Sequence, residues 1–185
     1  MRRLRVLLFG LLLVAGAASG PSQAASPALA ARLVQASVLS ADSIHLKLLA
    51  YLARGDITGA IAMYQVHTGQ AAPAWLMELQ GAYGVANQVA GRCQQVARVI
   101  HTAFLKLGQT PQYIAFRIDE MKPYMIFELA NGKQASVSRT GYHVAVRVGD
   151  VIHDAYTGPL GMKLSDYLSR LHAQKGVVWE MVSTP

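Results

Sequence analysis

This sequence lacks the residue patterns needed for an intrachain disulfide, for nucleic-acid binding and for metal binding. Cys93 is the single cysteine among 185 residues, so no disulfide can form within the chain. There is no run of lysine or arginine interleaved with aromatic residues, and there is no glycine-rich phosphate loop. The six histidines are scattered, without the close helical pair of a zinc hydrolase. We therefore expect no nucleic-acid partner, no metal and no cofactor.

The N-terminus has the pattern of a cleavable signal peptide. Three arginines within the first five residues precede an apolar run, Val6–Ala18, which is too short to span a membrane. Small residues at Ser22 and Ala24 favour cleavage after Ala24. We expect a secreted or periplasmic protein, exported by the general route, with no stable membrane insertion after cleavage.

The exported chain of about 160 residues is long enough for one domain with a real core. Loss of residues 1–24 removes three arginines and no acid, so the formal charge falls from +7 to +4. Exported proteins usually pair their cysteines, so an unpaired thiol in an oxidising compartment calls for a chemical explanation. The alternative is that Cys93 is a buried small hydrophobic residue.

The pattern of the remaining chain changes near residue 85. Residues 25–84 contain capping residues and apolar spacings typical of short helices, and we expect a helical accessory segment there. Residues 85–185 begin with a helix over 92–107, which is closed by Gly108 and carries Cys93 at its start. Strands are expected over 113–118, 124–129, 142–148, 151–155 and 177–182, with a helix over 163–171. The predicted fold class is α+β, with the Cys-bearing helix packed on a mostly antiparallel sheet.

The turn signal Gly149-Asp150 brings two further polar residues together. In a two-residue hairpin turn Val148 pairs with Val151, and side chains then alternate between the two faces of the strands. His143 and Asp154 become diagonal neighbours on one face, within reach of each other. His153 points to the opposite face, although a slip of one residue would exchange it with Asp154.

These three residues suit a thiol–imidazole–carboxylate triad. The unpaired N–H groups and the dipole of a helix N-terminus favour an anion, so they favour the thiolate of Cys93. His143 would accept the thiol proton and later protonate the leaving group, and Asp154 would fix the imidazole tautomer. We therefore predict Cys93, His143 and Asp154 as the catalytic residues.

Four short motifs resemble the papain-fold toxin domains of bacterial polymorphic toxin systems. They are residues 91–97 (GRCQQVA), 140–146 (TGYHVAV), 151–154 (VIHD) and 159–161 (PLG), and the resemblance covers roughly residues 85–175. It implies that residues 85–185 form a papain-like catalytic domain with the same triad. It also implies an oxyanion donor a few residues before the cysteine, where Asn87 and Gln88 are both candidates.

The resemblance implies an exported cysteine enzyme that acts on amide bonds as a protease, a glutamine deamidase or an acyl transferase. Its partners would be a protein or peptide substrate and a cognate immunity or inhibitor protein. A second resemblance, to NlpC/P60-like cell-wall peptidases with a Cys–His–His site, depends on His143, Gly149 and Ile152-His153. The alternative from another class is a non-catalytic helical interaction protein in which Cys93 is only packed.

Overall fold

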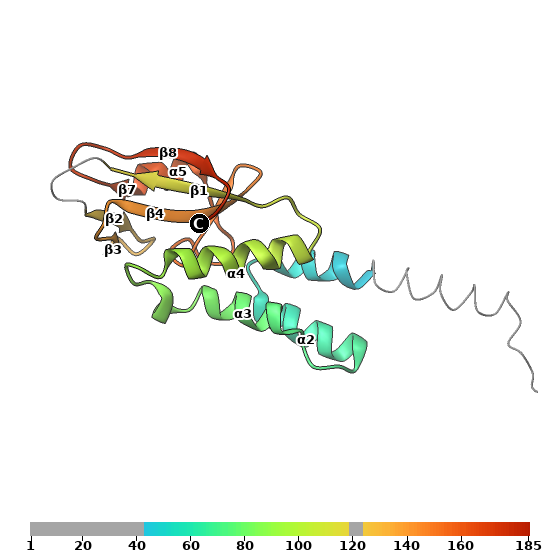
Figure 1. Ribbon diagram of the computed structural model, residues 1–185. Helices are drawn as coiled ribbons and strands as arrows, with labels where there is room; N and C mark the ends of the chain where they lie inside the picture. Colours follow the sequence, from blue (N-terminus) through green and yellow to red (C-terminus); the bar gives the residue numbers. More distant parts are fainter. Residues whose placement is uncertain (1–42, 119–123) are drawn as a thin grey trace, which may run out of the picture. The chain divides into compact units, whose positions relative to one another are not determined.

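The computed structural model describes residues 43–118 and 124–185, which all belong to one unit over 38–185 (Figure 1). The expected signal peptide and residues 25–42 of the expected helical segment lie outside the described residues. Among the helices of the described ranges, none has the length and apolarity needed to cross a membrane.

Short helices form the first part of the described chain. A helix over residues 43–52 is followed by α2 (Ile57–Thr68), α3 (Ala74–Ala82) and the 3-10 turn η1 (Val85–Asn87). The Asp56 side chain caps α2, accepting a 2.7 Å hydrogen bond from the backbone N–H of Gly59. The helical character expected up to residue 84 is thus confirmed over its described part.

One longer helix connects this part to the sheets. It is α4 (Cys93–Lys106), and its buried residues Val96, Ala97, Ile100 and Ala103 form an apolar stripe. The helix packs on two strands, β1 (Gln112–Arg117) and β4 (Tyr142–Val148), and α3 packs against it as well. Figure 1 shows α4 running between the sheet and α3.

Two antiparallel sheets follow, which confirms the α+β class. The larger has the order β6-β5-β4-β1-β8 and the smaller the order β3-β2-β7. Every strand pairing within the described ranges is antiparallel. The remaining elements are β2 (Met125–Glu128), β3 (Gln134–Ser138), β5 (Val151–His153), β6 (Met162–Lys163), α5 (Leu164–Arg170), β7 (Leu171–His172) and β8 (Val178–Val182).

The β4–β5 hairpin has the predicted register. Val148 pairs with Val151, and the ladder ends where Val146 pairs with His153. The expected strand over 151–155 is two residues too long, because the carboxylate of Asp154 accepts the backbone N–H groups of Tyr156 and Thr157 and closes a turn. Three strands were not expected: β3 has one large apolar residue, Val137, and β6 and β7 are two residues long.

A single hydrophobic core runs through the helical part and the sheets. It includes Leu48, Leu76 and Leu79 from the helices and Ile114, Phe116 and Val144 from the larger sheet, all at most 2% exposed. The helices before α4 therefore contribute to the same core that supports the sheet.

Candidate active site

Cys93 is the first residue of α4 and is partly exposed. The residue before it, Arg92, occupies the N-cap position, and its side chain does not cap the backbone N–H groups of the first turn. The first backbone N–H groups of α4 are therefore available to a negative charge at the thiol or at a group bound beside it.

His143 lies on β4, the central strand of the larger sheet, and is fully buried. It pairs across the ladder with Phe116, and the two rings are stacked with centroids 6.1 Å apart. A polar ring at this depth is stable only when hydrogen-bonded, so its partners decide its role.

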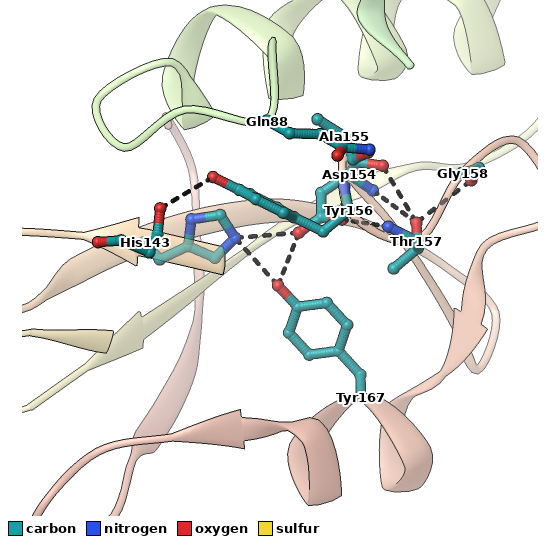
Figure 2. A network of polar contacts seen from close by, with 9 residues as sticks. Gln88, His143, Asp154, Ala155, Tyr156, Thr157, Gly158 and Tyr167 are labelled. Atoms are coloured by element: carbon teal, nitrogen blue, oxygen red, sulfur yellow. Dashed lines mark hydrogen bonds and ion pairs between the residues drawn. The ribbon is translucent and has the colours of Figure 1, made fainter. Parts of the chain in front are cut away.

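Asp154 supplies the main partner of this imidazole. It directly follows β5, and its Oδ1 accepts the N–H groups of Tyr156 at 2.8 Å and Thr157 at 2.9 Å. Its Oδ2 lies 3.1 Å from Nε2 of His143 (Figure 2). Both side chains of this pair are buried, at 0% and 3% exposure. The backbone turn thus holds the carboxylate with one oxygen directed at the histidine.

The acceptor character of the carboxylate determines the tautomer of His143. Because an ionised Asp154 can only accept, Nε2 must carry the ring proton in the neutral imidazole. Nδ1 is then the basic nitrogen, and it is buried without a well-formed hydrogen bond to any of the described residues. A buried nitrogen that is ready to accept a proton is what the thiol of Cys93 requires.

Cys93 and His143 shift each other's pKa. Burial raises the pKa of the Cys93 thiol, but hydrogen bonding and charge from His143, with smaller effects of the N–H groups of Val144 and Gln94, lower it overall. Burial lowers the pKa of His143, but the hydrogen bonds and charges of Asp154 and Cys93 raise it to about 9. The thiol and the imidazole are thus close enough to affect each other's pKa, although Nδ1 of His143 makes no well-formed hydrogen bond with any described residue.

These shifts favour the thiolate–imidazolium form of the pair at neutral pH. Burial raises the pKa of the Asp154 carboxyl, but His143, Tyr167 and the turn at Thr157 lower it overall, so the carboxylate stays charged. The charged carboxylate in turn stabilises the imidazolium. The structure therefore brings all three predicted catalytic residues into one coupled network.

Tyr167 is a further member of this network that the sequence did not reveal. It lies on α5, and its hydroxyl donates a 2.7 Å hydrogen bond to Oδ2 of Asp154 and lies 3.0 Å from Nε2 of His143 (Figure 2). The side chain is fully buried against Phe116 and Phe127. In the sequence it resembles an ordinary core residue of a short helix, so no local signal identifies it.

A cleft gives access to Cys93. Its volume is about 380 Å³, and its walls are the segment before α4, the first turn of α4 and the loop between β3 and β4. The residues that line it include Gly91, Cys93, Gln94, Arg139, Thr140 and Tyr142. The thiol therefore faces a space that can admit a substrate, while His143 and Asp154 lie behind it in the core.

The two candidate oxyanion donors, Asn87 and Gln88, form hydrogen bonds with different segments of the chain. Gln88 donates a 2.9 Å hydrogen bond to the carbonyl of Ala155, beside Asp154 (Figure 2). Asn87 donates a 2.8 Å hydrogen bond to the carbonyl of Gly81 at the end of α3. Gln88 is thus tied to the segment that carries the triad carboxylate, and Asn87 is not.

His153 lies apart from the triad imidazole. Its Nδ1 is 3.4 Å from the hydroxyl of Tyr83, and its ring packs on Phe104 of α4 with centroids 4.7 Å apart. Burial lowers its pKa to about 4, although the nearby charge of Asp154 opposes this shift. His153 is therefore a neutral, packed residue at pH 7 rather than an orienting group for His143.

Within residues 43–118 and 124–185, no three His, Cys, Asp or Glu side chains gather closely enough to hold a metal ion. Comparisons of the chain with family models, with curated proteins and with solved structures found no match. The interpretation of the site therefore depends on its own geometry and chemistry.

Proposed function

We propose that this protein is an exported papain-like cysteine enzyme that attacks amide bonds. The observation that carries this proposal is the position of Cys93 in a cleft at the start of α4, charge-coupled to a buried histidine that Asp154 orients. A merely packed cysteine needs neither a cleft nor an imidazolium partner.

The reaction begins with the thiolate of Cys93 and the imidazolium of His143. The sulfur attacks the carbonyl carbon of the amide, forming a C–S bond while the carbonyl electron pair moves to oxygen. Collapse of this intermediate breaks the C–N bond, and His143 gives its proton to the leaving nitrogen. A thioester remains on Cys93 and the imidazole is neutral.

The second half of the reaction regenerates the enzyme. His143 takes a proton from an acceptor, which then attacks the thioester carbon and releases the thiolate of Cys93. Water as acceptor gives proteolysis or glutamine deamidation, and an amine or alcohol gives acyl transfer. All three outcomes share the same thioester, so the acceptor that reaches the cleft decides among them.

The tetrahedral oxyanion needs hydrogen-bond donors that point toward it. The uncapped N–H groups in the first turn of α4 are suitable, because they lie beside the attacking sulfur and carry the positive end of the helix dipole. We assign the second donor to the amide of Gln88, which has one N–H beyond the bond it donates to Ala155.

The wall-peptidase alternative requires a second histidine as the orienting group. The histidine available for that role, His153, contacts Tyr83 and Phe104, whereas Nε2 of His143 lies 3.1 Å from Asp154. This geometry favours the Cys–His–Asp enzyme. A role as an exported toxin, with a cognate immunity protein that covers the cleft, is consistent with the same site.

The decisive experiment is alkylation of the folded protein with iodoacetamide, followed by intact mass spectrometry. The thiol should react rapidly at pH 6, where an ordinary cysteine of pKa about 8.5 is almost entirely protonated. A Cys93→Ala variant provides the blank. A rate that follows the ordinary thiol pKa would contradict nucleophilic activation and favour the non-catalytic interaction protein.

A further inference from the structure

The cleft beside Cys93 carries an unbalanced positive charge. Arg139 lines it, and no acidic side chain is among the lining residues. Arg139 is exposed and makes no hydrogen bond or ion pair with any residue of the described ranges. An arginine without a partner at the wall of a reactive cleft is available to a ligand.

Two neighbouring arginines, in contrast, have interaction partners. Arg117 forms a 2.9 Å ion pair with Glu180, and Arg92 donates a 3.0 Å hydrogen bond to Gln95. Among the residues that line the cleft, Arg139 carries the charge, and its guanidinium has neither an acidic nor a neutral partner in the described part of the chain. The positive end of the α4 dipole at Cys93 adds to its field.

The loop that carries Arg139 is held in place. The hydroxyl oxygen of Ser138, which is 2% exposed, accepts the N–H groups of Thr140 at 3.2 Å and Tyr142 at 3.1 Å. Gly141 has φ +75°, a left-handed conformation that favours glycine, and its carbonyl accepts the N–H of Ile118 at 3.0 Å. These contacts tie the loop to Ile118, the residue that follows β1, so the backbone at Arg139 is held at the edge of the cleft.

From this arrangement we infer that Arg139 is a specificity residue, and that the cleft takes amide substrates with a carboxylate close to the bond that Cys93 attacks. This inference rests on the proposed function. Guanidinium and carboxylate match in charge and in planar, two-pronged geometry. The carboxylate can belong to an acidic side chain or to the C-terminus of a peptide, because both present the same chemistry.

The test uses chloroacetyl probes on the full-length mature protein, since their reaction requires only the thiol. The Cys93 sulfur forms a C–S bond with the probe as the C–Cl bond breaks and chloride leaves. Chloroacetyl-glutamine amide is the neutral probe. Chloroacetyl-glutamate amide carries a side-chain carboxylate, chloroacetyl-glutamine carries a terminal carboxylate, and chloroacetyl-lysine amide carries a positive charge.

At low salt, at least one carboxylate probe should react about three- to tenfold faster than the neutral probe, and the lysine probe should react more slowly. The faster of the two carboxylate probes identifies the source of the carboxylate. Arg139→Gln should bring the carboxylate-to-neutral ratio close to one, and Arg139→Lys should keep most of it. Lys106→Gln, which removes one charge about 20 Å along α4 from Cys93, should leave the ratio as it is.

A wild-type protein without preference for either carboxylate probe overturns the inference, and so does an Arg139→Gln variant that keeps the preference. Both results leave the proposed function standing, provided that the neutral probe and iodoacetamide react rapidly. A thiol that reacts slowly with every reagent contradicts the proposed function itself, and the inference fails with it.

Discussion

Nε2 of His143 and Oδ2 of Asp154 lie 3.1 Å apart in the core, while the other nitrogen of the same imidazole is left free to accept a proton. His143 lies on β4 and Asp154 directly follows β5, the other strand of the same hairpin, while Cys93 begins a helix fifty residues earlier in the chain than His143. The two ring nitrogens therefore have different roles. The Asp154 carboxylate holds Nε2 in place, and Nδ1 can accept a proton from the thiol of Cys93.

The thiol pKa provides the first prediction. His143 is the main group that lowers the pKa of Cys93 against the effect of burial, so its removal should leave burial dominant. In His143→Gln we expect alkylation by iodoacetamide to fall steeply below pH 9, whereas the wild-type rate stays high toward pH 6. Rate profiles from pH 5 to 10 check this. If the two profiles coincide, His143 does not activate the thiol.

Catalysis should also have an alkaline limit. The pKa of His143 is raised to about 9, so the imidazolium that protonates the leaving nitrogen is present below that pH and is lost above it. Amide-bond cleavage should therefore decline as the pH rises through about 9, although the thiolate itself persists. Measurement of kcat/KM and of the alkylation rate against pH in the same buffers separates loss of the imidazolium from loss of the thiolate. Parallel curves above pH 9 would show that His143 is not the general acid.

Asp154→Asn tests the orienting role of the carboxylate. The backbone N–H groups of Tyr156 and Thr157 would hold the amide oxygen, so the new NH₂ would face Nε2 of His143. Two donors cannot pair, and the ring proton must move to Nδ1, the nitrogen that has to accept from the thiol. We expect a loss of activity of roughly 10⁴-fold, as in a Ser–His–Asp enzyme.

His153→Gln is the matched comparison for this variant. His153 contacts Tyr83 and Phe104 rather than the triad imidazole, so its replacement should reduce activity much less than Asp154→Asn. A larger loss in His153→Gln would instead support the Cys–His–His arrangement of a wall peptidase.

The burial of neutral His153 also predicts an acid-sensitive stability. Its folded pKa of about 4 lies below the unfolded value of 6.5, so the unfolded state binds a proton first as the pH falls. Stability should be fully present above pH 6.5 and decrease toward pH 4, by about 3 kcal/mol. Urea unfolding at several pH values measures this, in a Cys93→Ala background that removes the thiolate. His153→Gln should flatten the curve in this window, and an unchanged slope would assign the effect to another group.

The sequence predicted the local part of the site well. The turn at Gly149-Asp150 sets the strand register, which places Asp154 near His143 and turns His153 away, and the turn at Tyr156 and Thr157 then directs the carboxylate at the imidazole. Tyr167 could not be predicted, because a residue on α5 reaches the carboxylate only through tertiary packing. The weak strand β3 and the loop bearing Arg139 were missed for a similar reason, since long-range pairing decides them rather than apolar periodicity.

The role of Tyr167 can be measured by Tyr167→Phe. The variant loses the 2.7 Å hydrogen bond to the Asp154 carboxylate, which should reduce stability by about 1.5–3 kcal/mol. It should also raise the pKa of Asp154, because this bond is one cause of its low value. The acid limb of the activity profile should therefore move to higher pH.

The control is Tyr156→Phe, since the Tyr156 hydroxyl makes only a long 3.3 Å bond to the carbonyl of Ser136. It should destabilise the protein less and leave the acid limb in place. If Tyr167→Phe loses stability with no movement of the acid limb, the hydroxyl is a packing element and not a positioning group.

The helices before α4 belong to the core that supports the sheet, and this gives the last prediction. Leu79 of α3 is 1% exposed, and α3 packs directly on α4, the helix that begins at Cys93. Leu79→Ala should reduce the free energy of unfolding by about 2–5 kcal/mol, because it leaves a cavity. Met77→Ala on the same helix, where the side chain is 48% exposed, should change the free energy of unfolding by about 0.5 kcal/mol or less.

For the same reason, a chain that begins at Gly84 should fail to fold or lose its thiol activation. If it folded with full activity, the helical part would be dispensable to the site.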